Sequence, residues 1–438
     1  MKKNNKLKLV TRSIERKKHR RAVRIEKKRL RKNKRSNKGI SGLHYRERRY
    51  IFGMMGVPDD KIPIHTNKER GRLDIKIPKI FSLIENPEGV FSVLEQLGKT
   101  LGQRRYLQIN IDHESCLEHD LGAEIILAKA VKRVKSYLKS ESGITRWSGV
   151  LPDSVTMKRL ICSIGVVPEV TSRPLSFDGK DRLRLFRAKG VGDSFGNPRE
   201  QDAKTRNIES FVEYLDVCLR DHCRRLTKSG KTGLSAYVGE ILSNAEEHSG
   251  EKHWHIYGYL DNDADNHYCE ILIYNYGFTI FDSFYNSDVN SYAKSVINPY
   301  LSEHMKNGFM GSSWRKEDLV TLIALQARVS SKSYSDTSTR GNGTIDLIEF
   351  FEEVTAGVCS TGLKAKMCII SGSTYIHFDG SYKISNNKSG LEVIAFNKDN
   401  DLNSPPDAKY VKAIKCNGFP GTLIAIRFPI NDISQSDL

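Results

Sequence analysis

The chain has 438 residues, of which 38% are hydrophobic, and it carries a formal net charge of +18. This length suffices for two or three domains with cores of their own, and the composition suits a globular protein with a polar surface. No apolar run is long enough to cross a membrane, the basic start lacks the apolar core of a secretory signal, and the eight cysteines include no Cys-x-x-Cys pair. We therefore expect a cytoplasmic protein with reduced cysteines and no transmembrane segment.

The positive charge is concentrated at the start of the chain. Residues 1–38 contain 19 Lys or Arg and only two acids, so this stretch alone carries +17. We expect residues 1–45 to form a basic tail that is disordered, or helical once its charge is neutralised. Residues 1–38 are a candidate arm for nucleic acid or another polyanion, bound through counterion release. The alternatives are a solvated tail, a tail that touches ribosomes and RNA without specificity, and a mitochondrial transit peptide, which the abundance of Lys and the scarcity of Ser disfavour.

Strand and helix patterns alternate between residues 65 and 170, which predicts an open α/β layer. The expected strands lie near 73–78, 106–112 and 144–152, and the expected helices at 90–101, 121–138 and 155–164. The centre of this region, from Ile109 to Gly122, loosely resembles a STAS domain. In that family a strand and a short loop lead to a phosphorylatable Ser at a helix start, and Leu121 stands at that position here.

The next segments lead into the second half of the chain. Residues 171–200 are rich in Gly and Pro and predict a linker or an irregular hairpin. An amphipathic helix is expected over 203–228. Residues 261–267 form a polar stretch between two apolar strands. Its acids are spaced like those of a calcium loop, but the Gly and the terminal Glu of such a loop are missing, so we expect a hairpin turn. Further strands are expected at 254–260, 268–274, 367–371, 374–378, 391–396 and 421–428, and a further helix at 316–329.

A helix predicted between Leu234 and Gly250 carries the most informative polar pattern. Four residues advance a helix by about 400°, so Glu240, Asn244 and His248 share one stripe. A carboxylate, an amide and an imidazole in line can hold a metal-bound phosphate and a water molecule together. Taken alone, the helix is explained as well or better by a polar stripe that faces solvent.

This helix resembles the N box of the GHKL ATP-binding superfamily, which includes gyrase, MutL, histidine kinases and anti-sigma kinases. Three further motifs of that superfamily follow in its order, over about the last 240 residues. The stretch from Tyr274 to Ile280 resembles the first glycine box and contains Asn275, Gly277 and Thr279. It departs from the usual pattern twice, because Asn275 replaces an Asp and Thr279 replaces a second Gly.

The other two motifs lie closer to the end of the chain. Gly421 and Thr422 open a strand that resembles the last strand of the superfamily. The long insertion between the glycine boxes, 281–339, corresponds to the ATP lid. The second glycine box and the basic residue of the lid supply the candidate phosphate contacts, which are Lys332, Arg340, Gly341, Gly343 and Thr344.

The resemblance implies a role for each residue. Asn244 would coordinate Mg²⁺, Glu240 would act as general base or orient a water molecule, and His248 would touch phosphate or cap its helix. Asn275 would bind the adenine amino group, and Gly277 would let the backbone approach the base. Gly341 and Gly343 would form a backbone nest for phosphate, and Thr422 would reach the adenine through water.

The fold that follows is an α/β protein of α+β sandwich type. Residues 201–433 would form a GHKL, or Bergerat, domain with a mixed sheet and helices on one face, preceded by the smaller STAS-like domain. The expected function is Mg²⁺-dependent ATP binding, with ATP hydrolysis or phosphorylation of an unknown protein partner, as in an anti-sigma kinase. The alternative is a nucleotide-gated regulatory module with little turnover, associated with nucleic acid through its basic tail.

Overall fold

The computed structural model describes residues 42–57, 70–101, 105–141, 145–171, 177–191, 198–251, 253–285, 291–306, 314–326, 348–349, 351–352, 363–386 and 392–430. The chain divides into two compact units, 1–50 and 51–438. Helix α2 (Gly42–Met54) begins in the first unit. The predicted basic tail lies, apart from the start of α2, outside the described residues. All other described elements belong to the second unit.

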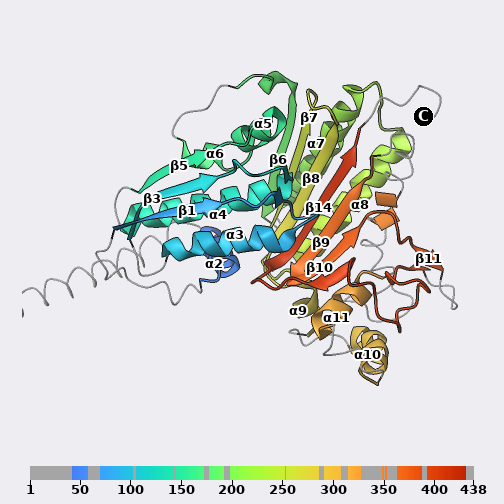
Figure 1. The fold of residues 1–438 in the computed structure, drawn as a ribbon. Coiled ribbons are helices and arrows are strands. Elements are labelled where there is room, and N and C mark those ends of the chain that lie inside the picture. Colours follow the sequence, from blue (N-terminus) through green and yellow to red (C-terminus); the bar gives the residue numbers. More distant parts are fainter. Residues whose placement is uncertain are drawn as a thin grey trace, which may run out of the picture. The chain divides into compact units, whose positions relative to one another are not determined.

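A three-stranded parallel sheet and its helices form an N-terminal layer within the second unit (Figure 1). The strands, in the order β1-β3-β5, are β1 (Arg70–Lys76), β3 (Arg105–Asp112) and β5 (Arg146–Val150). The helices are α3 (Pro87–Gly98), α4 (Leu121–Glu141) and α5 (Val155–Ser163). The α/β alternation predicted for this region is therefore confirmed, with helix and strand ends within a few residues of those expected.

Side-chain caps explain where the helices of this layer begin. Asn86 accepts a hydrogen bond from Gly89 N at the start of α3, and Asp120 accepts one from Ala123 N at the start of α4. Asp120 also receives the Ser82 hydroxyl at 2.5 Å, so its buried carboxylate is held on both sides. These contacts fix α4 in the position from which it contacts the rest of the unit.

A seven-stranded sheet forms the centre of the second unit, in the order β13-β10-β9-β14-β8-β7-β6. Its strands are β6 (Leu183–Val191), β7 (His253–Asp261), β8 (Tyr268–Tyr276), β9 (Lys366–Gly372), β10 (Thr374–Phe378), β13 (Val411–Ala413) and β14 (Phe419–Pro429). Every neighbouring pair is antiparallel. The prediction of a mixed sheet is therefore wrong, because short hairpins such as β7–β8 and β9–β10 impose antiparallel pairing.

Strand β6 corrects the predicted linker at 171–200. This strand pairs along its full length with β7 and forms one edge of the large sheet. Its Gly190 does not mark a loop: a Cβ there would lie 2.2 Å from the ring of Trp254, so the glycine makes room for the indole.

Helices cover one face of this sheet. They are α7 (Pro198–Arg220), α8 (Lys228–His248) and α11 (Lys316–Ala324), and Ile348 and Phe351 join the same core. The helix predicted over 203–228 ends earlier than expected, because α7 stops at Arg220 and Cys223 adopts a positive φ of 58°. Thr227 then caps α8 by accepting a hydrogen bond from Gly230 N.

The opposite face of the sheet is covered by the N-terminal layer. The backbone N–H of Leu121, at the position where a STAS domain would carry Ser, donates to the buried Glu270 of β8 at 2.5 Å. Lys366 of β9 forms an ion pair with Glu85 at 2.5 Å, and the Tyr375 hydroxyl donates to a backbone carbonyl beside it. The expectation of helices on one face alone is therefore corrected: the sheet is enclosed on both faces.

The chain between β8 and β9 contributes a small cluster of helices at the end of the sheet. α9 (Ile280–Tyr285) and α10 (Ser291–Lys306) pack with α11 around Phe284, Leu301 and Val320. The remaining short elements are η2 (Lys99–Leu101), α6 (Val167–Val170), η3 (Lys180–Arg182) and the ladders β2 (Ile80–Phe81) with β4 (Glu118–His119) and β11 (Ser385–Asn386) with β12 (Glu392–Val393). The strand expected at 391–396 is thus only two residues long in the described part. None of the described helices is long and apolar enough to cross a membrane.

Candidate functional site

Helix α8 carries the predicted polar stripe on its flank away from α7. On the flank toward α7, Lys204 donates to Ser243 and Glu246 at 2.9 Å each. The helical step of 100° per residue places the stripe on the other side of the sheet-facing residues. The stripe consists of three half-buried side chains, Glu240, Asn244 and His248. Since α7 packs on β6 and α8 on β7, this flank is turned toward β8 and β14.

Three polar side chains form a row across β8, β14 and β9 on the same face of the sheet. Asn275 of β8 is the strand partner of Thr422 of β14, and Thr422 is the partner of Ser371 of β9. Asn275 continues the alternation of Ile271 and Ile273, which pack in the core beneath α8. The Ser371 and Thr422 hydroxyls lie 3.1 Å apart. We call Asn275, Thr422 and Ser371 the polar row.

The amide of Asn275 has spare hydrogen-bonding capacity. The side chain is 7% exposed, and its Nδ2 donates to the carbonyl of Tyr276 at 3.4 Å. No other hydrogen bond joins this amide to a described residue, which leaves Oδ1 as an acceptor.

Gly277 brings the end of β8 against the end of α8. Its φ is 125°, and a Cβ on this residue would lie 2.1 Å from the carbonyl oxygen of Ser249, the residue after α8. The next residue, Phe278, donates its N–H to the same oxygen at 2.8 Å. Only glycine combines this φ with so close an approach, so Gly277 of the predicted first glycine box packs directly against the end of α8, the predicted N-box helix.

Thr279 has a local structural role that the sequence did not reveal. Its hydroxyl accepts a hydrogen bond from Asp282 N at 3.0 Å, and its N–H donates to the Asp282 carboxylate at 3.1 Å. This reciprocal pair is a capping box that starts α9. The departure from Gly at this position therefore coincides with the start of a helix.

The position of α8 is fixed by partly buried polar contacts at both of its ends. Glu246 accepts the indole N–H of Trp254 at 2.8 Å in addition to Lys204, which ties the helix to β7. At the other end, Lys231 bonds Asp216 of α7 at 2.7 Å. Burial raises the pKa of Asp216, but hydrogen bonds from Lys231 and from a backbone N–H outweigh burial and lower it. A carboxylate held ionised in this way anchors the start of α8.

Seven of the predicted site residues lie within the described ranges, namely Glu240, Asn244, His248, Asn275, Gly277, Thr279 and Thr422. The predicted residues that lie outside the described ranges are Lys332, Arg340, Gly341, Gly343 and Thr344. The structure brings Asn275 and Thr422 together and places Gly277 at the end of α8. Ser371 was missed from the sequence, because a single Ser at the end of an apolar strand has no spacing signal. It receives the N–H of Ile280 at 2.8 Å and so joins the polar row to α9.

No protein family profile, curated protein or solved structure compared with this chain matches it.

Proposed function

We propose that residues 201–433 bind ATP with Mg²⁺ in the manner of the GHKL superfamily, between the outer flank of α8 and the polar row. One observation supports this most directly. Asn275 and Thr422 come from two separate motifs that the resemblance assigns to the same adenine, and they are direct strand partners.

The residues on the base side fit an adenine. The Oδ1 of Asn275 can accept a hydrogen bond from the amino group of the base, and the Thr422 hydroxyl lies on the neighbouring strand to bind it through water. Gly277 would follow the base contact Asn275 closely along the chain, and it packs against the carbonyl oxygen of Ser249. The site is thus supplied with an acceptor and a hydroxyl.

The flank of α8 supplies the groups for phosphoryl chemistry. Asn244 would ligate Mg²⁺ through its amide oxygen, and the ion would neutralise charge on the phosphates. Glu240, one turn earlier, would accept a proton from the attacking water or hydroxyl. His248 would contact phosphate or remain at the helix end, and the five residues outside the described ranges remain candidate phosphate contacts. The reaction would be ATP hydrolysis or phosphorylation of a protein partner.

A regulatory module with little turnover is the second candidate. The N-terminal layer lies directly on the back of the sheet that carries the polar row, through Glu85 on Lys366 and Glu270 on Leu121. A nucleotide that shifts β8 or β9 would therefore also shift the residues of that layer that contact these strands. The resemblance of residues 65–170 to a STAS domain, a family of regulatory proteins, remains part of this second proposal.

Ligand-induced stabilisation tests the binding half of the proposal. ATP with Mg²⁺ should raise the melting temperature of the wild-type chain, because a ligand that binds only the folded state stabilises it. Asn244→Ala should lose most of this shift, and Glu209→Ala, an exposed change on α7, should keep it. An undiminished shift in Asn244→Ala would remove Asn244 from the site.

Labelled nucleotide distinguishes the two candidates. With γ-labelled ATP, release of phosphate indicates an ATPase, label on protein indicates a kinase, and neither indicates a regulatory module. Glu240→Ala should keep the ATP-dependent thermal shift and lose about 10²–10⁴-fold in turnover. If its turnover equals that of wild type, Glu240 is not the base.

A further inference from the structure

Within the described residues, strand β6 leaves one long edge of the seven-stranded sheet open (Figure 1). It pairs with β7 on one side over nine residues, and on its other side no described strand lies beside it. Alternate residues of β6 therefore direct their N–H and C=O groups outward, and none of these groups bonds another described backbone group. Such an edge can accept one further strand.

The two faces of β6 differ in character. Phe186 packs against the ring of Phe211 of α7, so this residue and its alternates face the helices. Leu185, Arg187 and Lys189 point to the opposite face, where all three are exposed. A strand added outside β6 would therefore meet an aromatic ring on one face and two cations on the other.

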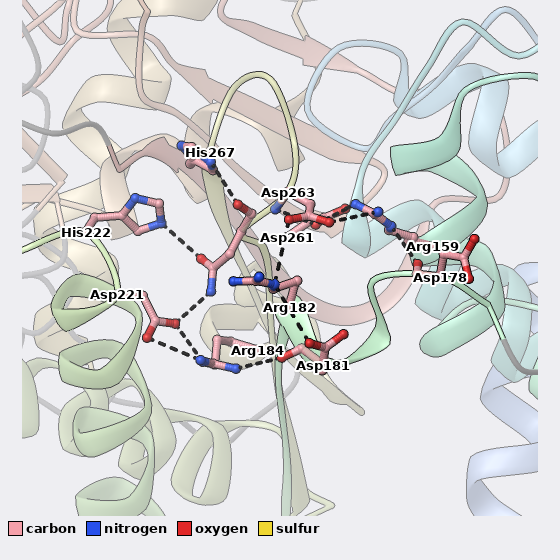
Figure 2. Close-up of polar contacts among 11 residues, drawn as sticks. Arg159, Asp178, Asp181, Arg182, Arg184, Asp221, His222, Asp261, Asp263 and His267 are labelled. Atoms are coloured by element: carbon pink, nitrogen blue, oxygen red, sulfur yellow. Dashed lines mark hydrogen bonds and ion pairs between the residues drawn. The ribbon is translucent and has the colours of Figure 1, made fainter.

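The cations of β6 differ in whether an acid neutralises them. Figure 2 shows Arg184, near the start of the strand, with its Nε 2.7 Å from the carboxylate of Asp221, just after α7. Arg187 and Lys189, further along, form no ion pair with any described residue, and Arg187 donates only to the backbone carbonyl of Ser163 at 3.2 Å. The second half of the strand therefore presents positive charge that a partner can neutralise.

Neighbouring elements add to this positive charge. Lys129 of α4 lies on the same face of the sheet, with its Nζ 5.5 Å from the centre of the Tyr257 ring. His255 is the strand partner of Lys189, and burial, followed by Lys129 and other nearby cations, lowers its pKa from 6.5 to about 2. No carboxylate is among the charges that act on it most strongly. The face beside Lys189 is therefore positive.

The open backbone and the positive charge together select among the possible occupants of this edge. A second copy of β6 would bring two positively charged strands together, and residues 1–38 of this chain, with +17, would be repelled as well. Nucleic acid suits the charge, but it has no row of amide donors and carbonyl acceptors to match the outer edge. An extended acidic peptide satisfies both the backbone groups and the cations.

We propose that the outer edge of β6 binds an extended acidic segment of a partner protein as an additional strand of the sheet. Acidic side chains of the segment pair with Arg187 and Lys189 on one face, and alternating apolar side chains lie beside Phe186 on the other. Main-chain hydrogen bonds provide the affinity, and the two cations select the sequence. The proposal is independent of ATP binding.

Labelled peptides test the proposal on the full chain. The probe is a peptide of about eight residues that alternates Val and Glu, and its controls are the same peptide with every amide N-methylated and a peptide with Lys in place of Glu. Fluorescence anisotropy at about 0.3 M salt, which weakens attraction to the basic tail, should show saturable binding of the probe alone. Equal binding of the N-methylated peptide would mean that charge suffices without strand pairing, and the proposal would be wrong. It would also be wrong if the probe did not saturate by about 1 mM.

Charge-reversal variants test whether the peptide binds at β6. Lys189→Glu should weaken binding of the Val-Glu probe roughly tenfold, because a repulsion replaces an attraction, and it should leave the melting temperature unchanged at this exposed position. Lys398→Glu, the same change at an exposed position between β12 and β13, should leave probe affinity unchanged. Equal probe affinity in the two variants would overturn the assignment. So would a loss of affinity in Lys189→Glu for labelled single-stranded RNA but not for the peptide, because the cations would then bind nucleic acid.

Discussion

Asn275 is the residue at which the chain departs most informatively from the motif it resembles. An Asp at this position can only accept hydrogen bonds, which suits the amino group of adenine. An Asn presents an acceptor and a donor from the same buried side chain, so it can also donate to the carbonyl oxygen of guanine. The departure therefore bears on which base is bound.

We predict that the wild-type protein binds ATP and GTP with similar affinity and that Asn275→Asp favours ATP. The carboxylate repels the guanine carbonyl and loses the donor, a difference of about one hydrogen bond or roughly tenfold in the ratio of dissociation constants. Calorimetric titration of both nucleotides measures the ratio. Asn266→Asp, which adds the same charge at an exposed turn, is the control. An unchanged ratio in Asn275→Asp would show that residue 275 does not contact the base.

Glu124 of α4 is a second residue whose environment has a measurable consequence. Its carboxylate is fully buried, with His113 Nε2 and His119 Nδ1 each 3.4 Å away. Burial raises its pKa, but the charges and hydrogen bonds of the two imidazoles outweigh burial and lower the pKa from 4.5 to about 2. A carboxyl group whose pKa is lower in the folded state stabilises the protein above its unfolded pKa, and that stabilisation is lost as the pH falls.

We predict that Glu124→Gln removes a pH-dependent part of the stability. In wild type, ionised Glu124 should contribute about 3 kcal/mol above pH 4.5, which disappears as the pH falls toward 2. The free energy of unfolding of wild type should therefore drop more steeply than that of Glu124→Gln between about pH 5 and about pH 2.5. Denaturant titrations at the two pH values provide the measurement, with the exposed Glu114→Gln as control. Parallel pH profiles for wild type and Glu124→Gln would contradict the prediction.

At the scale of elements, the sequence predicts best those helices and strands whose apolar residues recur at regular spacing. Helices α4 and α8 and strands β7, β8 and β14 lie close to where their apolar spacing placed them. Strand β6 was missed because its Gly190 was interpreted as a loop signal, although it makes room for Trp254 on the neighbouring strand. A glycine selected by a contact far along the sequence cannot be told from a turn glycine by its neighbours.

Two glycines with opposite surroundings test this reasoning. Gly190→Ala should destabilise the protein by about 3 kcal/mol, because the new Cβ would lie 2.2 Å from the rigid Trp254 ring. Gly239→Ala in α8 should stabilise it by about 0.5–1 kcal/mol, since the nearest atom to its Cβ is 3.7 Å away and alanine favours helix. Thermal unfolding of both variants provides the comparison. A Gly190→Ala variant as stable as wild type would mean that β6 does not pack on Trp254.

The candidate site was predictable only in its parts. Asn244, Asn275 and Thr422 each stand in a short motif, but that Asn275 and Thr422 face each other depends on the order of β8 and β14 in the sheet. That order is set by long-range packing, including the contact of Glu270 with Leu121 across the two layers. The spacing of apolar residues within one helix or strand does not predict such a long-range contact. For the same reason it does not predict that the N-terminal layer covers the second face of the sheet.

At the scale of the whole molecule, nearly all of the net positive charge lies in the N-terminal tail, and the rest of the chain is almost neutral. We predict that removing residues 1–38, which carry +17 of the +18, leaves ATP binding intact, because the proposed ligands start at Glu240. Any binding of nucleic acid by the full chain should fall steeply with salt and nearly vanish in the truncated chain. Fluorescence anisotropy with labelled RNA and DNA at two salt concentrations measures this for both chains. Equal affinity of the two chains would place the polyanion site elsewhere.

Strand β14 is the last described strand along the chain, yet it is the middle strand of the seven. During synthesis, β8 and β9 must therefore each wait with an open hydrogen-bonding edge until residues 419–429 have left the ribosome. The sheet can close only after residues 419–429 have been translated, and we expect this long-range closure to make folding slow and dependent on protection from other nascent chains. A chain interrupted before Phe419 would contain two half-sheets with nothing to join them, and we expect such products to aggregate rather than to persist as a shortened protein.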